Sequence, residues 1–300
     1  MRGYWQLLLI LSATWGASYL FIKVAVEDIE PATMMSARLL LAAAVLLGYL
    51  LVSTGVSVAL TELRAAWRAV LVLGLLNAAL PFWLIAWGEQ HIDSSVAAIA
   101  QATVPFFNLL LGLRFLPHDR VTWGRVAGLG LGAAGVAVLA GFNPVGGWWA
   151  AVGTLAVVLS SVSYAASGVY GQLRVRTVRG PVLATGSVVV GGLVLAPLGI
   201  AQAPTERPDG AAIASVLALA LLGTAFAQLV LYRMLLLHGS AKVSLVTYLM
   251  PAFAIVYGAV LLAEPITISV LGGLALILAG VALASGIPLL RRRQAATVAG

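Results

Sequence analysis

The chain has 300 residues, of which 62% are hydrophobic and 9% are charged, and its mean hydropathy is +1.05. A soluble domain must cover itself with polar side chains, so this composition excludes that class and predicts a membrane protein. The formal net charge of +7 would suit nucleic acid only if the basic residues formed one patch.

Apolar stretches of about 20 residues recur along the chain, the length a helix needs to cross about 30 Å of hydrocarbon. The alternation typical of an outer-membrane barrel is absent from the sequence, so we predict an all-α integral membrane protein with ten transmembrane helices. The first span is retained as a helix, since Trp15 and Lys23 lie where a signal-peptide cleavage site would fall. In chain order the predicted spans are 3–24, 32–53, 69–88, 96–116, 123–141, 149–171, 181–201, 211–237, 243–263 and 266–290.

Basic residues fall mainly on one side of this topology. The side that carries both termini holds fourteen of the seventeen lysines and arginines, and eight of the ten acidic residues lie on the other side. The positive-inside rule therefore predicts that both termini are cytoplasmic and that the number of spans is even. We expect the chain to lie in the inner membrane of a bacterium. The fourteen basic residues are Arg2, Arg64, Arg68, Arg114, Arg120, Arg125, Arg174, Arg176, Arg179, Arg233, Lys242, Arg291, Arg292 and Arg293.

The two halves of the sequence resemble each other at a constant offset. Gln101, Pro105 and Gly112 of the fourth span correspond to Thr247, Pro251 and Gly258 of the ninth, with 251 − 105 = 146 positions between partners. Five helices per half is an odd number, so the second copy must enter the membrane from the opposite side. We predict a five-helix repeat at 1–143, an inverted repeat at 144–290 and a basic cytoplasmic tail at 291–300.

Four motifs are similar to those of the EamA family of the drug/metabolite transporter superfamily. They are WGAS at 15–18, ARLLLA at 37–42, SLVTYLMP at 244–251 and LAEPIT at 262–267. The resemblance covers nearly the whole chain in two copies, although the first copy carries Asp119 where the family usually has Glu. It implies ten helices in two inverted repeats around a central cavity, and export of amino acids or other small metabolites.

Polar and aromatic residues deep in the spans are the candidates for substrate contact, because such groups are costly in hydrocarbon unless they face the interior. Gln101 lies on the polar face of the fourth span, and the matching face of the ninth bears Ser244 and Thr247. For Asn77 and Gln228, helix–helix hydrogen bonding is the alternative, and for the aromatic residues it is ordinary packing. The substrate-binding candidates are Trp15, Tyr19, Asn77, Gln101, Tyr164, Gln228, Ser244, Thr247 and Tyr248.

Pro105 and Pro251 each remove a backbone donor near mid-membrane, so we predict that they kink their helices and act in gating; improved packing is the alternative. Arg38 and Lys23 are predicted to snorkel to the surface and pair with nearby acids rather than bind a substrate. For Glu264 we favour a solvated carboxylate or a helix cap over a role in proton coupling.

Small residues also predict close helix packing. Gly124, Gly128 and Gly132 follow one another at four-residue spacing, and the tenth span is similarly rich in small residues around Gly272 and Gly280. Such stripes bring helices close together. We therefore expect the fifth and tenth helices to pack tightly against neighbours, with a homodimer contact as an alternative.

These observations and the resemblance together predict a secondary transporter that works by alternating access. The resemblance implies export of small metabolites, and of amino acids, including aromatic ones, before others. The chain lacks a GxxxxGK[ST] motif for ATP, and its three histidines are scattered, so we expect no cofactor, metal or catalytic group and no enzymatic activity. The expected partners are a small-molecule substrate and membrane lipid, without nucleic acid. The alternatives are a transporter of other drugs or metabolites, a channel, or a helper without transport activity.

Overall fold

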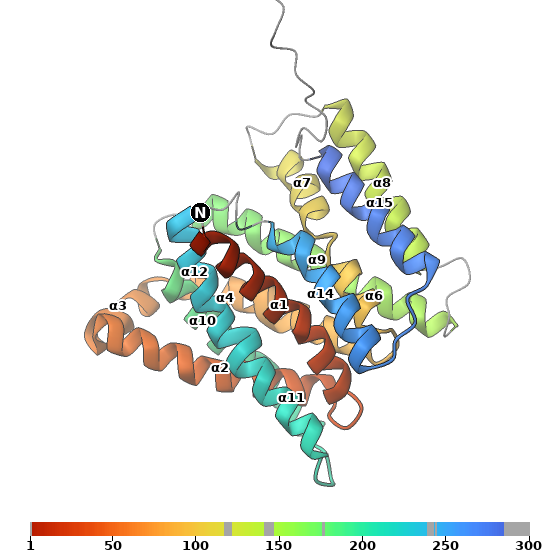
Figure 1. Ribbon diagram of the computed structural model, residues 1–300. Helices are drawn as coiled ribbons and strands as arrows, with labels where there is room; N and C mark the ends of the chain where they lie inside the picture. The colour runs from red at the N-terminus through yellow and green to blue at the C-terminus, as the bar shows by residue number, and fades with distance from the viewer. Residues whose placement is uncertain are drawn as a thin grey trace, which may run out of the picture.

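The computed structural model describes residues 2–116, 122–140, 147–175, 178–238, 243 and 245–284, and this part of the chain is helical without strands (Figure 1). The helices of the first half are α1 (Arg2–Ala25), α2 (Pro31–Thr54), α3 (Val56–Ala65), α4 (Trp67–Gly74), η1 (Leu75–Ala79), α5 (Leu80–Glu89), α6 (Ser94–Gln101), α7 (Val104–Phe115) and α8 (Trp123–Ala140). Those of the second half are α9 (Trp148–Arg174), α10 (Gly180–Ala201), α11 (Gly210–Ala220), η2 (Leu221–Phe226), α12 (Ala227–His238), α14 (Val246–Leu261) and α15 (Ile268–Ala284). The segments η1 and η2 are π-helical.

Seven helical stretches in the described part are long and apolar enough to cross a membrane. They coincide with the first, second, third, fourth, sixth, seventh and eighth predicted spans, and three shorter apolar helices coincide with the fifth, ninth and tenth. The protein is therefore an all-helical membrane protein, as its composition predicts.

The structure departs from the predicted elements between the second and third spans and inside the fourth. The connection between α2 and α4 contains a helix, α3, whose Val56, Val58 and Leu60 are exposed. The fourth span breaks into α6 and α7, and Thr103 closes the turn between them by donating from its hydroxyl to the Ala100 carbonyl at 2.6 Å. Sequence patterns missed α3 because it lies in a connection that carries Glu62 and Arg64 and does not read as a span, and they missed the break after α6 because the apolar run continues through it.

Four helix pairs make the most extensive contacts between elements: α8 with α15, α2 with α10, α1 with α14, and α5 with α9. In every pair, one helix comes from each half of the chain. The α8–α15 pair lies to one side of the other helices, beside α7 (Figure 1). The largest group of buried side chains joins α1, α2, α5 and α6 to the second half around Met35 and Val157.

Glycine allows α8 and α15 to approach each other closely. A Cβ atom on Gly280 would lie 2.6 Å from the Gly128 carbonyl oxygen and 2.6 Å from the Gly132 nitrogen, closer than real Cβ atoms approach. A Cβ on Gly272 of the same helix would have nothing within 4 Å. The predicted close packing of the fifth and tenth helices is thus confirmed, and within this chain they pack against each other.

Gly280→Val should destabilise the protein, because the added methyls separate two backbones that have no flexible side chain between them to yield. We expect a loss of about 1–3 kcal/mol, the usual cost of overpacking. Gly272→Val is the matched control and should leave stability nearly unchanged. Thermal unfolding of the purified variants in detergent measures both, and equal melting temperatures would contradict the proposed packing role of Gly280.

Candidate functional site

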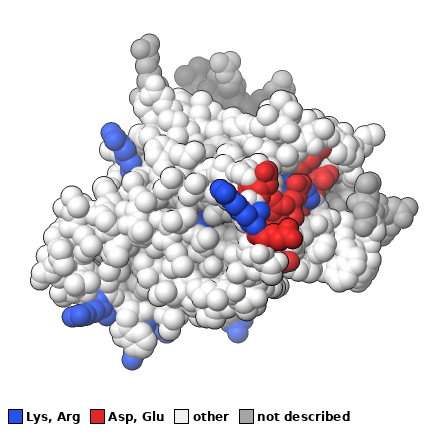
Figure 2. Space-filling view, turned by 90° about the horizontal axis from the view of Figure 1, so that it is seen from below, with Lys and Arg blue, Asp and Glu red and all other residues white. Residues whose placement is uncertain are grey.

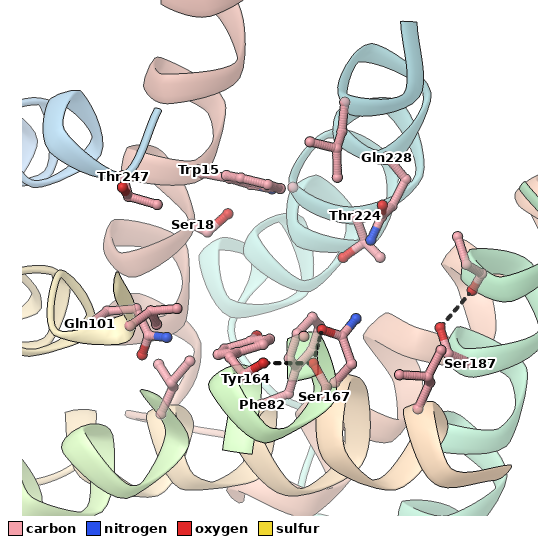
Figure 3. A pocket seen from close by; sticks show the side chains of 18 of the residues that line it. Trp15, Ser18, Phe82, Gln101, Tyr164, Ser167, Ser187, Thr224, Gln228 and Thr247 are labelled. Carbon is pink, nitrogen blue, oxygen red and sulfur yellow. Dashed lines mark hydrogen bonds between the residues drawn. The ribbon is translucent and has the colours of Figure 1, made fainter. Parts of the chain in front are cut away.

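A central cavity with a volume of about 560 Å³ lies among the helices of both halves. That size suits a small molecule. Figure 3 shows side chains of α1, α5, α6, α9, α12 and α14 projecting into one space, Trp15 and Thr247 on one side and Tyr164 and Phe82 on another. The lining is mainly apolar and aromatic, with amides and hydroxyls distributed around it.

Seven of the nine substrate-binding candidates line this cavity: Trp15, Tyr19, Asn77, Gln101, Tyr164, Gln228 and Thr247. Tyr248 instead packs with the buried cluster of Ile99 and Ile255, away from the cavity lining. Ser244 lies outside the described residues. The structure therefore brings most of the candidates together, and their role in binding remains a prediction.

Asn77 and Gln101 each take part in a contact between helices as well as lining the cavity. The Ser160 hydroxyl donates to Gln101 Oε1 at 2.7 Å, and Ser167 Oγ lies 3.1 Å from Asn77 Oδ1 (Figure 3). Both partners belong to α9, so these bonds join the two halves of the chain. Both amides thus have a structural role, which the sequence-based alternative expects for Asn77, and both also lie at the cavity wall.

Two cavity segments have π-helical geometry, which sequence reasoning missed. Asn77 lies in η1, and Gly223 and Thr224 lie in η2. The two segments begin 221 − 75 = 146 residues apart, the offset that relates the two halves. A π-helical turn replaces i→i−4 bonds with longer ones and is frequent at functional sites.

Arg38 is the only charged residue among the described residues that line the cavity. Its side chain is 5% exposed, its Nε donates to Thr224 Oγ1 at 2.9 Å, and its guanidinium carbon lies 4.3 Å from the centroid of the Phe82 ring. In the described part of the chain, no carboxylate oxygen lies within 4.0 Å of it. The predicted snorkelling is therefore wrong: the guanidinium turns inward, where Thr224 and Phe82 offer a hydrogen bond and a ring face.

The cavity extends toward one end of the helix bundle. Its lining reaches Gly171 and Gly180, close to the end of α9 and the start of α10, and Leu235 near the end of α12. None of the loops at the opposite end, residues 26–30, 90–93 and 202–209, lines it. Figure 2 shows acidic residues gathered on the face at this opposite end, which we call the acidic end. Its exposed acids are Glu27, Asp28, Glu30, Glu206 and Asp209.

Lys23 helps to close the acidic end. Its Nζ donates to two backbone carbonyls of the first half, those of Glu89 at 2.8 Å and Ile92 at 2.9 Å. These carbonyls lie where α5 ends, and Lys23 lies in the last turn of α1. The ammonium therefore links α1 to the connection between α5 and α6 rather than snorkelling as the sequence predicts.

Glu264 provides a second closure, between the two halves. Its Oε1 accepts from Ser94 N at 2.7 Å and its Oε2 from Ser95 N at 3.1 Å, which caps the N-terminus of α6. Asp93 occupies the N-cap position without a side-chain cap bond, so the distant glutamate replaces the local cap. Glu264 is 9% exposed; the interpretation as a helix cap is confirmed and the solvated carboxylate is wrong.

Several charged groups lie close together at the acidic end and act on Asp93. Partial burial raises the pKa of Asp93, the Glu264 carboxylate raises that pKa further, and Lys23 lowers it.

A tight backbone turn stands directly before Glu264. Ala263 has φ +54°, a left-handed conformation unusual for a residue other than glycine. This turn ends α14 and directs Glu264 to α6.

An apolar bundle of helices that surrounds a largely neutral cavity, open toward one end and closed at the other, is the build of a small-molecule transporter. The chain belongs to the EamA-like transporter family, whose pattern matches residues 3–141 and again residues 151–286. The relatives are named as transporters, which points to transport rather than enzymatic chemistry.

Three relatives illustrate the similarity. An uncharacterized transporter of Archaeoglobus fulgidus is 25% identical over 92% of this chain and 96% of its own length. A probable terminal-alkyne amino-acid exporter of Streptantibioticus cattleyicolor is 29% identical over 99% of this chain and 97% of its own length. The uncharacterized inner membrane transporter YedA of Escherichia coli strain K12 is 33% identical over 55% of this chain and 52% of its own length.

A solved crystal structure has the same fold, with a TM-score of 0.64 at 20% sequence identity over 95% of this chain and 97% of that one.

Glu264→Ala should loosen the acidic end, because it removes two charge-assisted hydrogen bonds between the halves. The chain contains no cysteine, so Ser95→Cys gives a single, nearly isosteric reporter at a position that is 3% exposed. We expect membrane-impermeant maleimide to label this thiol about tenfold faster in the Glu264→Ala background, from a loss of about 1.5 kcal/mol. Glu27→Ala, at an exposed acid of the same end, is the control, and equal rates in both backgrounds would contradict the closure.

Proposed function

We propose that the protein is a secondary transporter that works by alternating access. Its substrates are small metabolites, in particular amino acids, including aromatic ones. The observation that carries the substrate class is Arg38, a buried guanidinium at the cavity wall without a carboxylate partner in the described part of the chain. The apolar and aromatic lining supplies room for a hydrophobic side chain, and the amides and hydroxyls offer partners for an amino group.

Burying a permanent charge inside a membrane protein is costly, so a charge retained there usually has a function. The Arg38 guanidinium has five N–H donors, and it contacts the Thr224 hydroxyl, the Met35 sulfur and the Phe82 ring. A carboxylate could accept two parallel hydrogen bonds from the remaining donors, the geometry that arginine favours. The amino-acid exporter among the relatives is consistent with a carboxylate substrate.

Two inverted repeats are supported by the way in which helices pair. Exchange of the repeats maps the first span onto the sixth and the fourth onto the ninth, so the α1–α14 contact corresponds to the contact of α6 and α7 with α9. The α2–α10 and α8–α15 pairs each map onto themselves. This pattern is expected of two units related by a pseudo-twofold axis.

Alternating access is supported by the unequal ends of the cavity. One end is held by Lys23 and Glu264, while the lining extends toward the other. Pro105 stands in the first turn of α7, directly after the break that follows α6, and Pro251 lies inside α14. We propose that these two helices move to open the acidic end as the opposite end closes.

The charge distribution supports an orientation. If the basic side faces the cytoplasm, as the positive-inside rule predicts, both termini are cytoplasmic and the cavity receives substrate from inside the cell. This orientation is consistent with export, and we propose that the chain is a multi-pass protein of a bacterial inner membrane. Transport of other drugs or metabolites remains the alternative substrate class.

Arg38→Gln should weaken transport of L-phenylalanine in proteoliposomes. Loss of a charge-assisted interaction worth about 1.5–3 kcal/mol predicts a rise in apparent KM of about 10-fold to 100-fold. Phenethylamine, which lacks the carboxylate, should compete poorly with wild-type protein and relatively better with the variant. Arg68→Gln, at an exposed arginine that stacks on Trp67, is the matched control.

Counterflow of labelled phenylalanine is the measurement for both proteins. Saturable counterflow marks a carrier, linear flux marks a channel, and absence of flux for a panel of amino acids and drugs favours a helper. An unchanged KM in Arg38→Gln would remove the carboxylate site.

A further inference from the structure

Glu89 is a buried carboxyl group that the proposed transport mechanism does not use. It is the last residue of α5, its side chain is 0% exposed, and both of its carboxyl oxygens lack a hydrogen-bond partner. Its own backbone carbonyl accepts from Lys23 Nζ. The group therefore lies inside the closed acidic end, directly at the Lys23 link.

The charges around Glu89 come from several helices. Electrostatic neighbours of its carboxyl are Lys23 on α1, Glu264 on the loop after α14 and Arg38 on α2, and Tyr19 on α1 also interacts with it. Asp93 and His91 follow it in the connection to α6. On α9, Gly153 and Val157 pack against Gly88, so that side is apolar.

Lys23 does not act as a direct counter-ion. Within the described part of the chain, no carboxylate oxygen lies within 4.0 Å of its ammonium, which donates hydrogen bonds to the two carbonyls. An ionised Glu89 would thus lack both water and a hydrogen-bond donor, an environment that disfavours the charged form of a carboxyl. The neutral, protonated carboxyl loses much less solvation free energy on burial than the ion does.

We propose that Glu89 is a proton-binding site that controls the acidic end: the carboxyl holds a proton while this end is closed and releases it to water when the end opens. The inference rests on the proposed alternation between open ends. Because closure and protonation favour each other, linkage requires that a higher proton concentration at the acidic end favours closure. In the orientation proposed above, this end faces the outside of the cell, so external acid would favour the state open to the cytoplasm.

The test follows accessibility at the acidic end as a function of pH. The Ser95→Cys reporter, purified in detergent, is labelled with impermeant maleimide over about pH 5 to 8.5, a range that includes the titration of buried carboxyls. Rates are divided by those of the same reporter in the Glu89→Gln background, which cancels the titration of the thiol. We expect this ratio to rise several-fold with pH. The Glu89 carboxyl can lose its proton and so open the acidic end, whereas the glutamine of the variant cannot.

Two further variants keep the test specific. Glu89→Asp retains a titratable group and should keep the pH-dependent rise. Asp93→Asn removes the neighbouring half-buried carboxyl and should also keep it, which separates the two acids. A flat ratio in the wild-type background, or loss of the rise in Asp93→Asn, would overturn the proposal.

Phenylalanine counterflow in proteoliposomes separates this inference from the proposed function. Glu89→Gln should match the wild type under acidic conditions and show slower counterflow than the wild type at higher pH, because glutamine imitates the protonated carboxyl. Absence of counterflow in the wild type, with the pH-dependent labelling intact, would contradict the phenylalanine substrate and leave the proton site standing. Normal counterflow with pH-independent labelling would overturn the proton site alone.

Discussion

The structure depends on the cost of charge in an apolar medium. A guanidinium keeps its proton at any physiological pH, so Arg38 cannot escape that cost by becoming neutral. The fold meets it with the Thr224 hydroxyl and the Phe82 ring. Thr224 lies in a π-helical segment of the second half and Phe82 in α5 of the first, so the site of this one charge is built from both halves.

The same constraint explains how the acidic end is closed. In water, Lys23 and Glu264 would gain little from hydrogen bonds to backbone groups. Where they lie, the Lys23 ammonium meets carbonyls at the end of α5 and the Glu264 carboxylate meets N–H groups at the start of α6. Each charge thus satisfies backbone groups that a helix end leaves without partners, and attraction to the helix dipole has the favourable sign in both cases.

Much of the fold could be predicted from sequence because hydrocarbon thickness fixes the length of an apolar span. The predicted spans coincide with apolar helices, and the glycines of α8 and α15 predicted close packing. Residues such as Trp15, Asn77 and Gln101 could be selected for the cavity because polar and aromatic groups deep in spans need an interior partner. Their placement at one cavity follows from the structure, while substrate binding by them remains untested.

What sequence missed depends on contacts between distant residues. Arg38 lies near a span end, where snorkelling is usual, and only the position of Thr224, 186 residues away along the chain, turns it inward. Nothing in the residues next to Glu264 indicates that it caps a helix, because the α6 backbone group that it binds, Ser94 N, lies 170 residues away along the chain. The π-helical geometry of η1 and η2 leaves no mark in residue type, although their shared offset of 146 residues can be recognised afterwards.

The proposed substrate site also lies within electrostatic reach of the acidic end. Arg38 lines the cavity and lies within the electrostatic reach of Glu89. A carboxylate bound at Arg38 would neutralise a positive charge that acts on the Glu89 carboxyl, and would thereby change the balance between its protonated and ionised forms. Coupling of this kind is reciprocal: if substrate changes the protonation of Glu89, the protonation of Glu89 must change the affinity for substrate. In such a transporter, substrate binding at Arg38 would alter the closure of the acidic end through electrostatics alone, without a conformational change that connects the two sites.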